Sequence, residues 1–221
     1  MTENTERELI GKVIGGSLKD NLKVRLNKRV QDVHEGSFVV VESDEYLFYG
    51  LVTDLQLGAT DPRFADEVSD ARFAPELNQM LHGQTLYANL EMLPALMMEQ
   101  GPELGTAAYD QWMGEIEAGL RPEPRPLPVK TIPSHHHNVF LASEADIGAI
   151  FGKVGAAGNF VIGETREQGH KVAIDLKKFV QRSSGIFGAT GTGKSFLTRI
   201  ILAGLMQHDV ASVLVFDMHN E

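Results

Sequence analysis

The sequence predicts a small β-barrel that carries a mixed, partly helical insertion and is followed by the first βαβ part of an α/β domain. Three observations support this prediction. Short runs rich in Val, Ile, Phe and Tyr alternate with turns in the first 55 residues, acidic residues concentrate in the middle of the chain, and a glycine-rich loop precedes an amphipathic helix near the end. The expected domains are 1–145, with the insertion at about 57–137, and 146–221.

The composition narrows the class of protein. The chain has 221 residues, of which 43% are hydrophobic and 23% charged, and this is ordinary for a globular protein with a buried core. It contains no cysteine, which excludes disulfides and cysteine-ligated zinc or iron–sulfur centres. No apolar run reaches about 18 residues and the N-terminus is charged, so neither a membrane span nor a secretory signal is indicated. We therefore expect a cytoplasmic protein.

The barrel is expected from short strands that follow one another closely. Glycines and polar residues separate these apolar runs, as in small barrels and sandwiches. The expected strands are 9–14, 22–26, 37–42 and 46–55. The last two read as a hairpin with residues 43–45 at its tip. A further strand at 138–142 is expected to close the barrel.

The middle of the chain has a distinct charge. Residues 54–123 contain 13 acidic and 3 basic residues, a net charge of −10 that equals the net charge of the whole chain. Within and just beyond this stretch we expect a strand at 84–93, a helix at 103–120 and an extended segment at 121–133, which holds five prolines. Two interpretations stay open, a solvated insertion and an acidic docking surface for a partner. The acidity therefore says little about nucleic-acid binding elsewhere in the chain.

The last third of the chain alternates strand and helix patterns. A helix is expected at 144–151 with Ser143 as its N-cap, followed by strands at 160–162, 171–174 and 184–187. Residues 194–207 have the spacing of an amphipathic helix. Residues 212–216 form an unbroken apolar run, which is typical of a buried parallel strand. Because one βαβ unit does not complete the sheet, we expect this strand to lack neighbours.

Residues 188–195, GATGTGKS, fit the pattern G-x-x-x-x-G-K-[ST] in full. Glycines let backbone N–H groups converge on an anion, and the helix that follows directs its dipole at the phosphates. Lys194 would supply a mobile positive charge to the β and γ phosphates, and the Ser195 hydroxyl is the expected Mg²⁺ ligand. The predicted cofactors are ATP and Mg²⁺. The candidate nucleotide-binding residues are Gly188, Ala189, Thr190, Gly191, Thr192, Gly193, Lys194, Ser195 and Phe196.

The chain ends in DMHNE, directly after the expected strand at 212–216. Ligand-binding groups gather at the carboxyl ends of parallel strands, which would bring Asp217, His219 and Glu221 near the glycine-rich loop. An ordinary polar turn explains the same residues equally well. With Lys194, Asp217 and Glu221 are the candidate catalytic residues.

Together, GIFGATGTGKSFLTRIILAGL and SVLVFDMHNE resemble the HerA branch of the HerA/FtsK ATPases. The N-terminal runs IGKVIGG, SFVVVE and YLFYGLVTDL resemble the HAS barrel of that family. The resemblance implies a RecA-like motor that forms a homo-hexamer and uses ATP to translocate double-stranded DNA, often with a NurA-like nuclease in end resection. It also implies that Asp217 and Glu221 match acidic positions near the active site.

The resemblance also sets out what to expect beyond the loop. One βαβ unit does not complete a doubly wound domain, so we expect an N-terminal portion of a longer ATPase that hydrolyses no ATP by itself. Two alternatives stay open. One is an ATPase of a conjugation, secretion or DNA-packaging system, and the other is a non-catalytic module for ring assembly and partner docking.

Two further clusters have ordinary explanations. Side chains alternate between the faces of an extended strand, so His135, His136 and His137 cannot all bind one metal ion. We expect them to be structural or solvated. The basic cluster at 19–29 could contact phosphates, but a solvated barrel face is the better interpretation.

Overall fold

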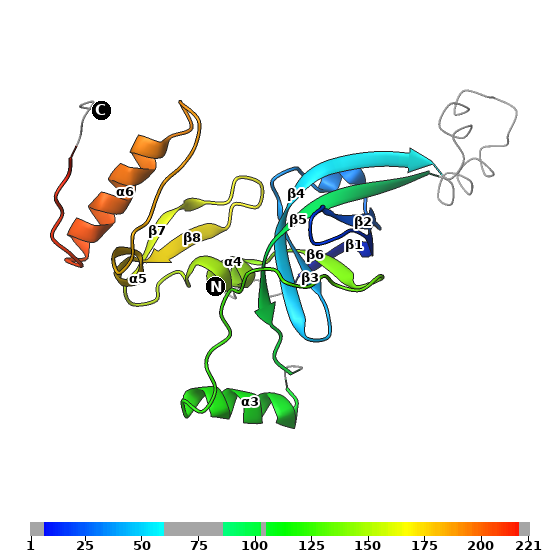
Figure 1. Ribbon diagram of the computed structural model, residues 1–221, viewed down its shortest axis with the longest axis horizontal. Helices are drawn as coiled ribbons and strands as arrows, with labels where there is room; N and C mark the ends of the chain where they lie inside the picture. The colour runs from blue at the N-terminus through cyan, green and yellow to red at the C-terminus, as the bar shows by residue number, and fades with distance from the viewer. Residues whose placement is uncertain (1–6, 60–85, 103–104, 217–221) are drawn as a thin grey trace, which may run out of the picture. The chain divides into compact units, whose positions relative to one another are not determined.

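The computed structural model describes residues 7–59, 86–102 and 105–216 of the chain (Figure 1). The chain divides into two compact units, and the boundary falls between Ala142 and Ser143. Each unit has its own hydrophobic core.

The first unit is a closed antiparallel barrel. Its strands are β1 (Glu8–Gly15), β2 (Leu22–Leu26), β3 (Phe38–Glu42), β4 (Tyr46–Ala59), β5 (Leu86–Glu99) and β6 (Asn138–Leu141), arranged in the order β1-β2-β5-β4-β3-β6. A short 3-10 helix, η1 (Val30–Asp32), lies between β2 and β3. The predicted barrel is therefore confirmed, including its closure by the strand at 138–142, because β6 pairs with both β1 and β3.

Alternating side chains fill the barrel. Leu22, Val24 and Leu26 of β2 are buried, whereas the residues between them point outward. This two-residue period fixes the register, because a slip by one position would bring the outward-facing charges into the core. The barrel core consists of Ile10, Val13, Leu22, Val24, Leu26, Val33, Val39, Val41, Phe48, Val52, Leu90, Met92, Met97 and Val139.

Strand β5 corrects the predicted insertion. The interval 57–137 is not inserted as a whole, because residues 86–99 lie between β2 and β4 in the barrel and pair with both. The sequence pattern ended this strand at 93, before Pro94. The strand continues because Pro94 lies opposite Gly50, where the register of the β4–β5 pair shifts, and proline is tolerated at such irregularities.

Between β5 and β6 the chain forms helix α3 (Ala107–Glu117), within the predicted helical range, and an extended segment. Thr106 caps the helix by accepting a hydrogen bond from the Tyr109 N–H. Arg121, which follows α3, forms ion pairs with Glu115 of α3 and Glu99 of β5. These two pairs connect the end of α3 to β5. The proline-rich segment contains no helix, and Leu127 forms one isolated bridge with Met97 of β5.

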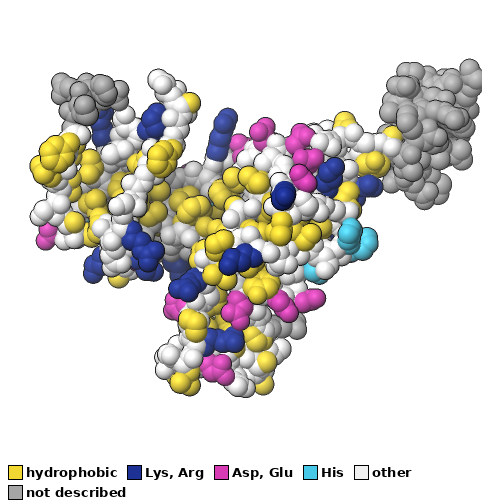
Figure 2. Space-filling view, viewed as in Figure 1, with side chains coloured by type: hydrophobic (Ala, Val, Ile, Leu, Met, Phe, Trp, Pro, Cys, Tyr) yellow, Lys and Arg dark blue, Asp and Glu magenta, His cyan; other side chains and the backbone are white. Residues whose placement is uncertain are grey.

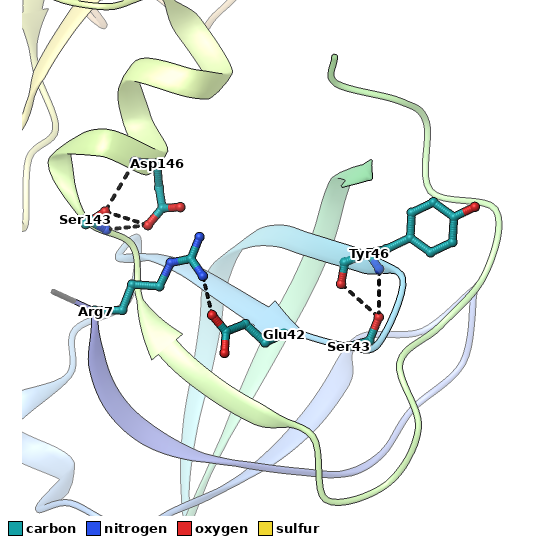
Figure 3. A network of polar contacts seen from close by, with 6 residues as sticks. All are labelled: Arg7, Glu42, Ser43, Tyr46, Ser143 and Asp146. Carbon is teal, nitrogen blue, oxygen red and sulfur yellow. Dashed lines mark hydrogen bonds and ion pairs between the residues drawn. The ribbon is translucent and has the colours of Figure 1, made fainter. Parts of the chain in front are cut away.

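The second unit begins with α4 (Glu144–Phe151), which has the predicted bounds and the predicted cap. Ser143 Oγ accepts a hydrogen bond from the Asp146 N–H, and Asp146 accepts one from the Ser143 N–H at 2.8 Å (Figure 3). This is a capping box, which satisfies two backbone donors at once. Figure 3 also shows the β3–β4 turn of the barrel, where Ser43 and Tyr46 exchange hydrogen bonds, and the ion pair between Arg7 and Glu42.

The rest of the second unit is an antiparallel pair of strands with two helices. The pair consists of β7 (Asn159–Glu164) and β8 (Lys171–Asp175), followed by α5 (Leu176–Val180) and α6 (Lys194–Gln207). Its core centres on Leu176, Ile201 and Leu205. Half-buried apolar residues pack around them, namely Phe160, Ile162, Ile174, Phe179, Ile186, Leu197 and Val210.

Two predicted strands are absent from the described residues. Residues 184–187 and 212–216 have no regular secondary structure and form no ladder. Phe187 is 92% exposed and Phe216 is 86% exposed, so the run at 212–216 has the exposure expected of an apolar run that lacks neighbours, not of a buried strand. A buried parallel strand requires hydrogen-bonding neighbours in its sheet. In the described part of this unit the only sheet is the β7–β8 pair, and neither run pairs with it.

Candidate nucleotide-phosphate site

The loop at 188–193 leads directly into α6, as the sequence pattern requires. Residues Ala189 to Thr192 form a turn in which the Thr192 N–H donates to the Ala189 carbonyl oxygen at 3.4 Å. Gly191 and Gly193 have φ values of 83° and 87°, in the left-handed region that other residues resist. These two glycines therefore let the backbone curl at the start of the helix.

The side chain of Lys194 folds back over this turn. Its Nζ donates a hydrogen bond to the Ala189 carbonyl oxygen at 2.8 Å, and the Thr192 hydroxyl donates to the same oxygen at 2.7 Å. The ammonium group is thus held across the loop by a neutral carbonyl. A phosphate oxygen would be a stronger partner, because hydrogen bonds between two charged groups are stronger than those to a neutral acceptor.

The N-terminus of α6 is open to an anion. Its N-cap residue is Gly193, and no side chain caps the helix. The first turn contains no acidic residue, so no carboxylate of that turn competes for the positive end of the helix dipole. Ser195 and Phe196 lie in this first turn and are exposed, with Phe196 at 68%. Such a terminus binds phosphate through backbone N–H groups and the helix dipole.

The buried side of α6 fixes the helix in place. Ile201 and Leu205 are each 6% exposed and pack in the core of the second unit. At Gly204 the helix comes so close to β7 that an added Cβ would lie 2.6 Å from the Phe160 ring. The phosphate loop is therefore attached to a helix that is packed tightly on its strand.

The residues of this loop and of the first turn of α6 are suited to bind a nucleoside triphosphate. Lys194 would hold the phosphates by charge, the loop and first-turn N–H groups would bind phosphate oxygens, and Ser195 would offer its hydroxyl to Mg²⁺. When bound, Mg²⁺ would neutralise part of the charge on the phosphates. Within the turn, the Ala189 carbonyl oxygen and the Thr192 hydroxyl form the hydrogen bonds that shape the loop. The residue pattern does not predict this role.

The other predicted site residues have different outcomes. Asp217, His219 and Glu221 lie outside the described residues. His137 Nδ1 accepts a hydrogen bond from the Ser134 N–H at 3.2 Å, which gives it a structural role in the turn before β6. In the described ranges, no three His, Asp or Glu side chains are grouped so that they could hold a metal ion.

The geometry defines a class of protein, one in which a small closed barrel precedes a P-loop α/β segment. Comparison with protein families is more specific. Residues 10–81 match the HAS barrel domain, and residues 160–221 match the central domain of helicase HerA. The chain is thus HerA-like, with an N-terminal HAS barrel followed by α/β elements consistent with the start of a RecA-like domain. No curated protein matches the chain.

The HAS-barrel match ends at residue 81, but the barrel itself also contains β5 and β6. The HerA match covers the phosphate loop, α6 and the residues after it. It supports a P-loop ATPase in general terms and, with it, the use of a nucleotide. None of the helices in the described ranges is long and apolar enough to cross a membrane.

Proposed function

We propose that the protein is the nucleotide-binding and barrel portion of a hexameric, ATP-driven translocase or helicase that acts on double-stranded DNA. The observation that carries this proposal is the N-terminus of α6, which no side chain caps and which follows a complete phosphate loop, with Lys194 Nζ donating to the Ala189 carbonyl oxygen. The HAS-barrel and HerA matches support the choice of this motor among P-loop proteins.

Each site residue has a role in the proposal. Lys194 binds the terminal phosphates and Ser195 the Mg²⁺ ion, while loop N–H groups hold the remaining phosphate oxygens. Asp217 and Glu221 are proposed to act near the γ phosphate, as the family resemblance implies. We further propose that the motor works in the cytoplasm in DNA end processing, with a NurA-like nuclease as its partner.

ATP hydrolysis by the intact protein tests this function. Phosphate release from Mg²⁺–ATP would be measured with and without a linear DNA duplex. We expect the duplex to raise the rate several-fold and K194A to abolish both rates, because removal of the ammonium group removes a charge that stabilises the phosphates. K177A, which removes an exposed lysine of α5, is the matched control and should hydrolyse ATP normally.

An ATPase rate that is the same with and without the duplex would contradict the translocase proposal and favour a different P-loop motor. Residues 1–221 by themselves are expected to give no steady turnover. Turnover that depends on Lys194 in these residues alone would show that this expectation is wrong.

A further inference from the structure

The outer surface of the barrel has a small group of cations on adjacent strands. Lys12 lies on β1, and Lys23 and Arg25 lie on β2. Lys12 and Arg25 are direct cross-strand partners, so their side chains lie on the same face. Lys23 lies two positions before Arg25, and therefore on the same side of β2. We call these three residues the cation face.

In the described part of the chain, two neutral side chains hold Arg25. Its guanidinium carbon lies 3.7 Å from the centroid of the Tyr87 ring, and its Nε donates to Asn89 Oδ1 at 2.8 Å. Both partners are neutral, so the side chain is oriented while its charge is not cancelled. The remaining guanidinium N–H groups can then pair with two oxygens of one phosphate, which is the geometry that arginine favours.

The structure separates the basic cluster at 19–29 into paired and unpaired members. Lys28 forms an ion pair with Glu8, and Arg29 forms one with Asp32. Lys12 and Lys23 are exposed and have no ion-pair partner among the described residues. The cation face therefore keeps its charge.

Two carboxylates lie beside this face. Glu91 is the cross-strand partner of Lys23, and Asp54 is the next residue across on β4. Glu91 accepts hydrogen bonds from the side-chain amides of Asn21 and Gln56, and Asp54 accepts from Gln56 as well. Both carboxylates are thus engaged by amides.

The arrangement favours phosphates over bases. Proteins that bind single strands present open aromatic rings on which bases stack. The Tyr87 ring is not open in this way, because Arg25 lies over it and it also covers Gly58, where an added Cβ would be 2.3 Å from a ring atom. A flat set of cations without an available ring suits the backbone of a duplex.

We propose that the cation face of the HAS barrel, Lys12, Lys23 and Arg25, binds the phosphate backbone of double-stranded DNA without sequence preference. This contact is separate from the phosphate loop and goes beyond the proposed function, which assigns no DNA contact to the barrel. In the proposed DNA translocase, the barrel unit would thus supply an additional contact with the duplex.

Fluorescence anisotropy with a labelled DNA duplex of about 20 base pairs, without nucleotide, tests the proposal. The test variant is K12E/K23E. The control is R125E/K130E, which makes the same charge change at two exposed residues of the proline-rich segment in the same unit. R25Q probes the guanidinium separately, and circular dichroism checks that each variant is folded.

We expect K12E/K23E to weaken binding at least ten-fold at low salt and to lower the slope of log K against log salt by about two, because each lost phosphate contact removes close to one counterion. R125E/K130E should retain the affinity of the parent chain within about three-fold. Equal losses in both variants, or no duplex binding by the parent chain, would overturn the proposal. ATP binding to the same samples shows separately whether the phosphate loop is intact.

Discussion

At the scale of single residues, the close contact between the backbone of α6 and β7 fixes the helix that follows the phosphate loop. Gly204 lies on α6 where the helix meets the Phe160 ring, and any side chain there would need the ring to move. Gly114 of α3 is a glycine in a helix with open space around its Cβ position. Both read alike in sequence, as helical glycines in an amphipathic pattern. Only the packing distinguishes a glycine that is required from one that is not.

We predict that G204A loosens α6 by about 1–3 kcal/mol, the usual cost of adding a group to a packed contact. Amide hydrogen exchange in Lys194–Gln207 measures this, and exchange there should become faster than in the parent chain. G114A is the control and should slow exchange in α3 slightly, since alanine favours the helix. Unchanged protection of α6 in G204A would contradict the packing described here.

At the scale of elements, local signals predicted much of the structure. The N-cap of α4 and the apolar spacing of α6 gave the bounds of these helices, because a capping box and a helical period depend on nearby residues. Pairing between distant strands was harder to predict. β5 was cut short at Pro94 because a sequence does not show that the proline meets an irregular register opposite Gly50. Residues 212–216 have a strand pattern, but a strand also needs a neighbour.

The capping box of α4 provides a test at this scale. S143A removes the Ser143 Oγ, which accepts from the Asp146 N–H and donates to Asp146 Oδ2. This loss should destabilise the start of α4 by about 1 kcal/mol. Amide exchange within Glu144–Phe151 should then become faster. S143T, which keeps a hydroxyl in place, should behave like the parent chain, and equal exchange in S143A and S143T would argue that the cap contributes nothing.

At the scale of the whole molecule, the distribution of charge matters more than its total. On the face drawn in Figure 2, basic and acidic side chains are interspersed over the barrel rather than gathered into one large patch. A net charge of −10 therefore does not exclude an anionic partner, because contacts with phosphates act over short distances in salt solution. The candidate site shows the same principle, since one lysine and an open helix N-terminus suffice to favour an anion.

The phosphate loop was the most predictable part of the site, because its pattern specifies both the residue types and the helix that follows, whereas the strand expected before it at 184–187 is not formed. The pattern could not predict the hydrogen-bond partner of Lys194, the Ala189 carbonyl oxygen, since every residue has a backbone oxygen and the sequence does not show which one is used. Asp217 and Glu221 rest on the family resemblance alone.

The most direct test of the central claim, that residues 188–196 form a nucleotide-phosphate site, is the affinity of the chain for Mg²⁺–ATP by isothermal titration calorimetry. We predict one site per chain and a loss of roughly ten- to a hundred-fold in K194A, because one charge-assisted contact contributes about 1.5–3 kcal/mol. K177A should bind as the parent chain does. Equal affinity in K194A and the parent chain, or no binding by the parent chain, would contradict the account.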